Sequence, residues 1–252
     1  MMKERNLAES TTSHYFSDPA KHSSKIASEG TREMLPLYPF VIAGGRNTER
    51  LYVQHISDIT SYKFNVIPRY FGNESNYHLK FPQRIEEILE RNNNPKIFCL
   101  FDFDTIYDNE QNKANYTEFK DKIKEHIKNR NVVLCPTMPC IEYWFLLHFE
   151  NNTALFKTNA DVVKVLKEYM GSYFSVNSTT SVSEFATKLK KEKYLRDKDW
   201  VEKLCSAGKL ETAITRAKEN IEKAEQDKNI QEQSYTYVYK LFDEYDISES
   251  FL

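Results

Sequence analysis

The stretch Lys96-Ile97-Phe98-Cys99-Leu100-Phe101-Asp102-Phe103-Asp104 decides which fold class the sequence predicts. Its five apolar residues, Ile97 to Phe101, run without interruption after the turn-forming Asn92-Asn93-Asn94-Pro95. Such a run predicts a strand that is buried on both faces, with helices above and below a parallel sheet. Asp102 and Asp104 follow at the carboxyl end of this strand, where open α/β sheets bind ligands. Residues two apart on a strand point the same way, and two such carboxylates repel each other unless a cation lies between them.

The overall composition predicts a globular, soluble chain. Its 252 residues are 40% hydrophobic and include 16 Phe and 16 Tyr, which is enough for a sizeable core. The formal net charge is −2, so any contact with nucleic acid must come from a local basic patch. The four cysteines show no CxxC spacing, and three of them lie in apolar contexts, which indicates small core residues in a reducing compartment. Because no apolar run reaches about 20 residues and no signal peptide is recognisable, we expect a cytoplasmic protein without a membrane partner.

Strand and helix patterns alternate on both sides of the central stretch. Strands are predicted over four segments: 40–43, 63–67, 97–101 and 132–134. Helical patterns separate them, and the resulting βαβ order predicts a mainly parallel four-stranded sheet sandwiched by helices. Beyond the sheet, the sequence shows only helical patterns, over 159–170, 182–192, 197–206, 208–226 and 234–246.

These patterns divide the chain into three parts. Residues 1–34 are polar and rich in Ser and Thr, which is typical of a flexible leader. Residues 35–156 form the predicted α/β core. Residues 157–252 form a predicted helical C-terminal region that packs on this core.

A glycine turn ends the first predicted strand. Gly44-Gly45 breaks the strand, and a helix is predicted to begin near Glu49. A carboxylate in the first turn of a helix is favoured by the helix dipole alone, so Glu49 needs no functional explanation. The same turn also brings Arg46, Asn47 and Glu49 to the sheet edge that holds the two aspartates. A structural role and a site role for Glu49 therefore both remain open.

Glu142 lies within a strongly apolar predicted helix, Cys140 to Phe149. An unpaired buried carboxylate is costly, so Glu142 must be paired, bound to a metal or placed at the mouth of a pocket. His148 comes six residues later and does not share a clean helix face with Glu142. A core histidine whose ring nitrogens are hydrogen-bonded is the favoured interpretation for it, ahead of a metal ligand.

The segment from Lys188 to Lys198 contains six basic and two acidic residues. Such a run is usually only a solvated face. Next to a cluster of acids, Lys190 and Lys193 could instead hold a phosphate backbone. No Walker A loop, zinc-ligand spacing or GxSxG elbow is present, so the sequence gives no sign of those chemistries.

Together these residues resemble the RloB family, whose core resembles the Toprim fold, over roughly residues 38–245. The most specific block is Met138-Pro139-Cys140-Ile141-Glu142-Tyr143-Trp144-Phe145-Leu146-Leu147-His148-Phe149, which is similar to the family's N-P-x-[FI]-E-x-W-x-L-L-H-F. Phe101-Asp102-Phe103-Asp104 looks like the family's D-x-D. The remaining similar blocks are the first strand and turn, 40–52, and the helical tail, 213–218 and 236–241.

The resemblance implies a function. Toprim domains place a glutamate and a D-x-D around magnesium, and they make or break phosphodiester bonds. RloB-type proteins are encoded near restriction loci, often beside an ABC-type ATPase, and are taken as phage-defence effectors. We therefore expect a nuclease that uses Mg²⁺ or Mn²⁺ on RNA or DNA. The implied catalytic residues are Glu49, Asp102, Asp104 and Glu142, of which Glu49, Asp102 and Asp104 would hold the metal. The resemblance also supports Thr48, and the glycine turn and the basic run add Arg46, Asn47, Lys190 and Lys193 as candidates for substrate binding.

One position departs from the family pattern, because Gly44 stands where the family has its first acidic residue. Either Glu49 takes over as ligand or base, which Mg²⁺ permits because it needs only one or two protein carboxylates, or the metal site is weakened. In the second case the chain is a non-catalytic Toprim-like module that binds nucleic acid or a partner ATPase. A nucleotide-binding sensor is a third interpretation.

Overall fold

The computed structural model describes residues 35–45, 48–67, 77–107, 110–190, 197–246 and 248–250. The predicted leader, 1–34, and three candidate substrate-binding residues lie outside these ranges: Arg46, Asn47 and Lys193. Lys190 is the last residue of helix α8 (Val182–Lys190), and its side chain also lies outside the description. What the sequence predicts for these residues stays a prediction.

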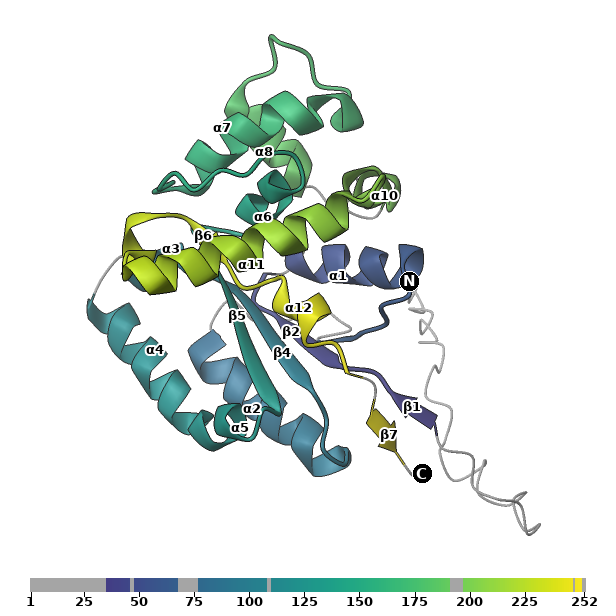
Figure 1. Ribbon diagram of the computed structural model, residues 1–252, viewed down its shortest axis with the longest axis vertical. Helices are drawn as coiled ribbons and strands as arrows, with labels where there is room; N and C mark the ends of the chain where they lie inside the picture. The colour runs from purple at the N-terminus through teal and green to yellow at the C-terminus, as the bar shows by residue number, and fades with distance from the viewer. Residues whose placement is uncertain are drawn as a thin grey trace, which may run out of the picture.

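The core of the fold is a five-stranded sheet with the strand order β3-β2-β4-β5-β6 (Figure 1). Its four parallel strands are β2 (Phe40–Ala43), β3 (Asn65–Ile67), β4 (Ile97–Asp102) and β5 (Val132–Met138). The fifth, β6 (Tyr235–Thr236), is antiparallel to β5. The predicted α/β class and mainly parallel sheet are confirmed, whereas the predicted number of four strands is wrong.

The missing strand lies within a segment that the sequence predicts to be helical, 234–246. Tyr235, Tyr237 and Tyr239 alternate with smaller residues, which is the period of a strand and not of a helix. Thr236 Oγ1 lies 2.8 Å from Thr137 Oγ1 of β5 in a buried hydrogen bond. The Tyr237 N–H donates to the Pro136 carbonyl at 3.0 Å, so this end of β5 is paired although proline lacks an N–H. β5 consequently continues past the proline at which the sequence predicts its end.

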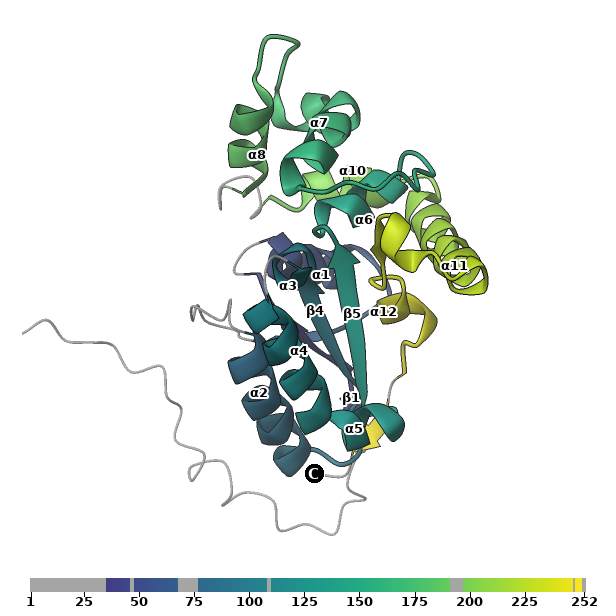
Figure 2. The ribbon, with the colours of Figure 1, turned by 90° about the vertical axis from the view of Figure 1, so that its left-hand side faces the viewer.

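Helices cover both faces of the sheet (Figures 1 and 2). α1 (Thr48–Ile59) follows β2 and packs on one face against β2 and β3. The other face carries α2 (Tyr77–Arg91), α4 (Glu110–Lys122) and α5 (Lys124–Lys128). Because β2 leads into a helix on one face and β4 leads into helices on the other, the winding direction reverses between these two strands. The crevice at such a reversal is where open α/β sheets bind ligands.

The remaining helices gather beyond the carboxyl ends of the strands or beside β6 (Figures 1 and 2). Beyond the strand ends lie α8 and three others: α6 (Glu142–Leu147), α7 (Asn159–Met170) and α10 (Asp199–Cys205). Beside the sheet lie α11 (Lys209–Asp227) and α12 (Lys240–Asp243), and shorter pieces are α3 (Asp104–Tyr107), η2 (Gly171–Phe174) and η3 (Ile230–Glu232). A separate antiparallel pair joins β1 (Leu35–Leu37) to β7 (Ser248–Ser250).

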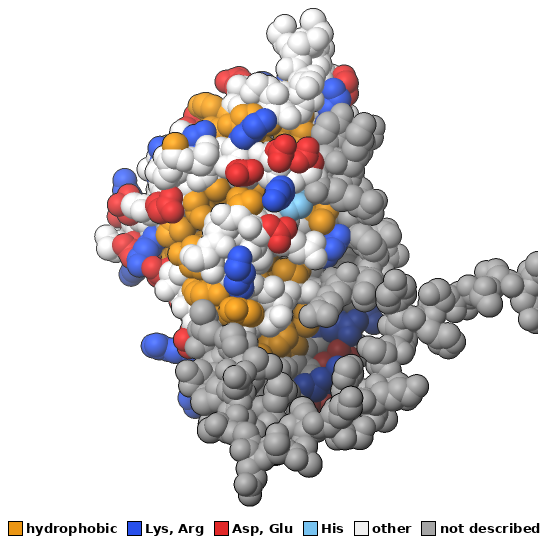
Figure 3. All heavy atoms as spheres, turned by 90° about the vertical axis from the view of Figure 1, so that its right-hand side faces the viewer, with side chains coloured by type: hydrophobic (Ala, Val, Ile, Leu, Met, Phe, Trp, Pro, Cys, Tyr) orange, Lys and Arg blue, Asp and Glu red, His pale blue; other side chains and the backbone are white. Residues whose placement is uncertain are grey.

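One connected hydrophobic core joins the sheet to these helices. It includes Phe98 of β4, Tyr52 of α1 and Trp144 of α6, all fully buried. The predicted C-terminal region therefore shares its core with the sheet and also contributes β6 to it, while the limits of the three predicted parts stay a prediction. In the described part of the chain, no helix is long and apolar enough to cross a membrane. On the face shown in Figure 3, acidic and basic side chains are interspersed among hydrophobic ones, as the balanced charge predicts.

Candidate active site

Asp102 is the last residue of β4 and lies at the reversal point between β2 and β4. Its Oδ1 accepts a hydrogen bond of 2.9 Å from the backbone N–H of Ile141, just before α6. Burial raises the pKa of Asp102 well above its usual range, and repulsion from Glu49, Glu142 and then Asp104 raises it further. The fold thus brings the other three predicted catalytic carboxylates within electrostatic range of Asp102.

Asp104 differs from its predicted position on the strand. β4 ends at Asp102, Phe103 lies in a bend, and Asp104 begins the short helix α3. The bend is held by two backbone hydrogen bonds, from Phe103 N–H to the Thr137 carbonyl at 2.8 Å and from Asp104 N–H to the Pro139 carbonyl at 3.2 Å. The alternation rule for strands therefore does not apply across this bend, and Asp104 affects the pKa of Asp102 less than Glu49 or Glu142 does.

Glu49 lies in the first turn of α1 and is only 5% exposed. A Cβ placed on Gly45 would overlap the Glu49 carboxylate. The carboxylate therefore fills the space beside the glycine turn that a larger residue at position 45 would need. Glu49 combines the helix-dipole position predicted from the sequence with a location next to Asp102, so its structural role and its site role are compatible.

Gly44 has a packing reason that the sequence does not reveal. Its N–H donates to the Leu100 carbonyl of β4 at 2.7 Å. A Cβ at this position would lie 3.1 Å from the Leu100 carbonyl oxygen and 3.1 Å from Phe101 Cβ. Residue 44 thus lies against the central strand, and a side chain there would require its neighbours in β4 to shift by a few tenths of an ångström.

Glu142 begins α6 and is 2% exposed. Every residue of α6 is buried, as the sequence predicts, although the α-helix covers only Glu142–Leu147. Trp144 Nε1–H donates to the Tyr52 hydroxyl at 2.8 Å and thereby ties α6 to α1. The Phe145 ring meets the Trp200 ring edge-on, with centroids 5.4 Å apart, which ties α6 to α10. These contacts fix the carboxylate of Glu142 relative to that of Glu49.

Cys140, which the sequence predicts only as a core residue, also lies beside two of the candidate site residues, Glu142 and Asp102. It is buried, and Asn159 Nδ2 donates to its Sγ at 3.1 Å. Burial, the negative charges of Glu142 and Asp102, and a hydrogen bond with Glu142 raise the pKa of the Cys140 thiol. Its place two residues before Glu142 in the most specific sequence block is the signal that could have identified it.

The family model described as RloB-like protein matches residues 40–244, from β2 to the end of α12. The chain belongs to the RloB-like family. The match covers the four predicted catalytic acids of this RloB-like protein, and it covers strands β2 and β4, between which the winding direction reverses. No curated protein and no solved structure matches the chain.

The donor chemistry of this edge suits a hard divalent cation. All four acidic side chains offer oxygen ligands, and their excess negative charge is what Mg²⁺ and Mn²⁺ neutralise. Within the described residues, however, no three His, Cys, Asp or Glu side chains are grouped so that they could hold a metal ion together. The residues therefore fit an ion that takes one or two protein carboxylates and completes its shell with water and substrate phosphate.

The predicted substrate-binding residues are placed only in part. Thr48 is the first residue of α1 and is buried. At the start of the basic run, Lys188 Nζ pairs with Glu184 Oε1 at 3.4 Å, as expected for a solvated helix face. Contact between substrate and Thr48 or Lys190 stays a prediction.

His148 of the RloB-like protein makes stability depend on pH. Its Nδ1 lies 3.0 Å from the Trp144 carbonyl, so Nδ1 carries the proton, while its Nε2 is buried without a hydrogen-bond partner in the described part of the chain. The prediction that both ring nitrogens are satisfied is therefore correct for one of them. Burial lowers the pKa of His148 to about 3, with the charges of Lys209 and Arg216 acting in the same direction.

In the unfolded chain this histidine becomes protonated below about pH 6.5, whereas in the folded protein it stays neutral down to about pH 3. The contribution of neutral His148 to the free energy of unfolding is therefore fully present above pH 6.5 and is lost as the pH falls. We expect a loss of about 2 kcal/mol in the free energy of unfolding between pH 7 and pH 5, measured with urea. His148→Asn keeps a donor near Nδ1 and should remove this loss, while His126→Asn, at a partly exposed site on α5, should leave it. An unchanged pH profile in His148→Asn would contradict the assignment.

Proposed function

We propose that this RloB-like protein is a Toprim-type nuclease that depends on Mg²⁺ or Mn²⁺ and acts in antiviral defence. The observation that carries the proposal is the convergence of Glu49, Glu142 and Asp104 on Asp102 at the reversal point of the sheet. Repulsion between these acids disfavours their charged forms, and a bound cation would favour them. The family resemblance supplies the reaction, which is hydrolysis of a phosphodiester bond.

The protein residues have distinct parts in this proposal. One or two of the carboxylates of Asp102, Asp104 and Glu49 would hold the ion, and the Ile141 N–H fixes the Asp102 carboxylate for this purpose. A bound Mg²⁺ supplies compensation for negative charge on the scissile phosphate. Glu142 or Glu49 accepts a proton from the attacking water on a carboxylate oxygen. The water oxygen then bonds to phosphorus, the P–O bond to the leaving oxygen breaks, and the leaving oxygen takes a proton from solvent water.

The proposed substrate is RNA or DNA, and the proposed protein partner is an ABC-type ATPase. Phosphate contacts are assigned to Arg46, Asn47 and Thr48, beside the glycine turn, and to Lys190 and Lys193. Helix α8, which ends at Lys190, lies beyond the carboxyl edge of the sheet (Figure 2). This location supports a role for the basic segment in holding a nucleic-acid backbone near the carboxylates.

Cleavage of labelled tRNA and DNA tests the proposal. The wild-type protein, Asp104→Ala and the Asp102→Ala/Asp104→Ala double variant are compared in Mg²⁺, in Mn²⁺ and in EDTA. We expect cleavage by wild type only with a metal, and loss of both cleavage and cell toxicity in the variants. Asp121→Ala changes an exposed aspartate of α4 and is the matched control. Unchanged cleavage and toxicity in the double variant would overturn the proposal.

A second candidate is a catalytically weakened Toprim-like module that binds nucleic acid or the partner ATPase. Two observations favour it: Gly44 in place of the family's acidic residue, and the lack of a three-donor metal group among the described residues. Crystals soaked in Mn²⁺ separate the two candidates through the anomalous signal at Asp102. An ion there supports the nuclease, whereas none at saturating Mn²⁺, with nucleic-acid or ATPase binding retained, supports the binding module.

A further inference from the structure

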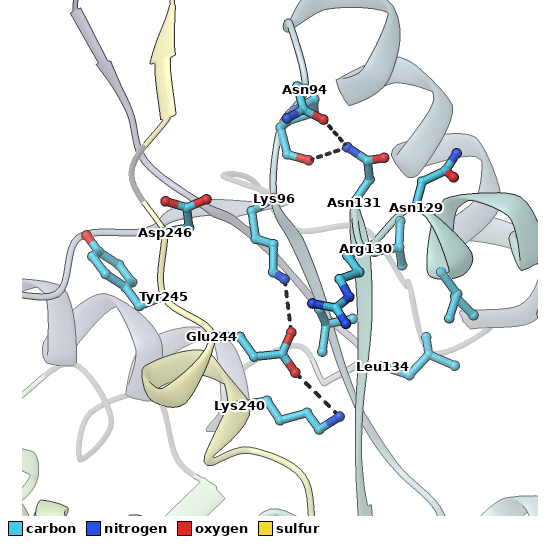
Figure 4. Close-up of a pocket in the computed structure, with 14 residues that line it drawn as sticks. Asn94, Lys96, Asn129, Arg130, Asn131, Leu134, Lys240, Glu244, Tyr245 and Asp246 are labelled. Carbon is cyan, nitrogen blue, oxygen red and sulfur yellow. Dashed lines mark hydrogen bonds and ion pairs between the residues drawn. The ribbon is translucent and has the colours of Figure 1, made fainter.

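A groove of about 880 Å³ lies at the amino-terminal edge of the sheet, opposite the carboxylates (Figure 4). The turns before β4 and β5, the end of α5 and the segment 240–246 form its walls. This volume is within the range of sites that enclose a small organic ligand. The groove lies far from the proposed nuclease chemistry, so it needs an explanation of its own.

Cationic side chains converge in this groove around one carboxylate. Lys96 Nζ lies 2.9 Å from Glu244 Oε2, and Lys240 Nζ lies 3.5 Å from Glu244 Oε1. Arg130 also points into the groove (Figure 4) and makes no ion pair with any residue in the described ranges. Three cationic side chains thus surround the Glu244 carboxylate (Figure 4). Ion pairs as accessible as those of Glu244 contribute little stability, so an anion of higher charge can displace it.

The wall that carries Arg130 is fixed by the fold. Arg130 has a φ of 60°, and its N–H donates to the Ile127 carbonyl while the Asn131 N–H donates to the His126 carbonyl. This pair of bonds is the Schellman ending of helix α5, which accounts for the left-handed conformation. Asn131 Nδ2 also donates to Asn94 Oδ1 at 2.8 Å and joins the two turns. The backbone at Arg130 is therefore held in place by these hydrogen bonds.

The same groove offers groups suited to a nucleoside. The side-chain amides of Asn94 and Asn129 line it and can hydrogen-bond the edge of a base. Tyr245 lines it as well, with its hydroxyl bonded to the backbone N–H of Lys63 at 2.9 Å and donating to the Lys63 carbonyl at 3.1 Å. A fixed aromatic ring of this kind is a surface on which a base can stack.

We propose that this groove binds a nucleoside phosphate. Its phosphate takes the place of the Glu244 carboxylate between Lys96 and Lys240 and reaches the Arg130 guanidinium. The base lies against Tyr245 and the side-chain amides. The site lies at the opposite edge of the sheet from the proposed nuclease centre and does not depend on it.

Calorimetric titration of the full-length protein tests the site. ATP, AMP, adenosine, inorganic phosphate and a short 5′-phosphorylated oligonucleotide are compared at low salt with EDTA, so that no metal-bound nucleotide can form at the carboxylates. We expect saturable one-to-one binding of nucleoside phosphates, and weaker binding of adenosine and of phosphate alone. Binding of the oligonucleotide but not of free nucleotides would identify the ligand as the phosphorylated end of a nucleic acid.

Two variants change affinity in opposite directions. Arg130→Asn removes the charge with a residue that tolerates the left-handed conformation, and it should weaken binding about tenfold or more. Lys228→Asn makes the same change outside the groove, at a helix end with a φ of 55°, and should leave affinity unchanged. Glu244→Gln releases both lysines and should tighten binding roughly three- to tenfold.

The absence of saturable binding by every nucleoside phosphate would overturn the proposal. Equal losses in Arg130→Asn and Lys228→Asn, or weaker binding in Glu244→Gln, would overturn it as well. Failure of the proposed nuclease activity has no bearing on these titrations, because they contain no metal. An Asp102→Asn protein should bind the nucleotide as wild type does.

Discussion

Asp102→Asn is expected to stabilise the metal-free protein while it abolishes metal-dependent cleavage. Asparagine keeps an oxygen that can accept the Ile141 N–H bond, but it carries no charge. The substitution therefore removes the burial cost and the repulsion from Glu49 and Glu142 that raise the pKa of Asp102. We expect a gain of about 1 kcal/mol in the free energy of unfolding at neutral pH, and a loss of about 100-fold or more in cleavage.

The dependence of this gain on pH follows from the direction of the pKa shift. The folded protein holds the Asp102 proton more tightly than the unfolded chain, so stability from this group is present at low pH and is lost as the pH rises through the folded-state pKa. The advantage of Asp102→Asn should therefore grow as the pH rises. Urea unfolding in EDTA at several pH values measures it.

A control variant and a melting-temperature measurement with Mn²⁺ test whether the effects of Asp102→Asn arise at the metal site. Asp121→Asn, at an exposed position of α4, should change neither stability nor cleavage. Mn²⁺ should raise the melting temperature of wild type, because it binds the folded state, and should not raise that of Asp102→Asn. If Asp102→Asn instead lowers stability in EDTA, the carboxylate is a structural group that holds the start of α6, and the site assignment fails.

Gly44→Glu is expected to destabilise the protein by about 1–3 kcal/mol and to restore no activity, although it supplies the family's acidic residue. A Cβ at this position crowds the Leu100 carbonyl oxygen at 3.1 Å, and this oxygen belongs to the central strand β4 between two neighbouring strands. Any shift of this oxygen would disturb the hydrogen bonds of β4 to its neighbouring strands. The introduced carboxylate would also join a cluster that is already overcharged.

The control for an added side chain in the glycine turn is a comparison of Gly44→Ala with Gly45→Ala. At position 45 the three atoms nearest to the added Cβ belong to the carboxylate at the end of the Glu49 side chain, whereas at position 44 they belong to Leu100 and Phe101 of β4, two of them backbone atoms. We therefore expect Gly44→Ala to cost more stability than Gly45→Ala, while Gly45→Ala should affect cleavage through displaced Glu49. Unfolding and cleavage assays on both variants measure these effects. A stable, more active Gly44→Glu protein would show that the β2–β4 contact is adaptable and that the packing explanation is wrong.

Local sequence patterns were sufficient for the centre of the fold. The run from Ile97 to Phe101 predicts a strand buried on both faces, and β4 is such a strand at the centre of a parallel sheet. The apolar residues around Trp144 predict a buried helix, and α6 is fully buried. Both predictions succeed because burial of many apolar side chains outweighs every local alternative.

Local patterns failed where a partner distant in the sequence decides the conformation. β6 is two residues long and exists because Tyr235 and Thr236 pair with the end of β5, about 100 residues earlier in the chain. Asp104 leaves the strand because Pro139 and Thr137 hold the bend before it. The residue preferences within 234–246 and 102–104 do not report these hydrogen bonds, because the partners lie elsewhere in the chain.

The sequence by itself therefore determined the α/β class and the central strand, and it supplied the four acids as site candidates. Only the tertiary structure decided that Glu49 and Glu142 act on Asp102 more strongly than Asp104 does, and that a side chain at Gly44 would crowd β4. The physical reason is that residue type and spacing fix what a segment can bury, whereas distances between charges and between backbones depend on how separate segments pack. The groove around Glu244 likewise exists only because the end of the chain returns to the amino-terminal edge of the sheet.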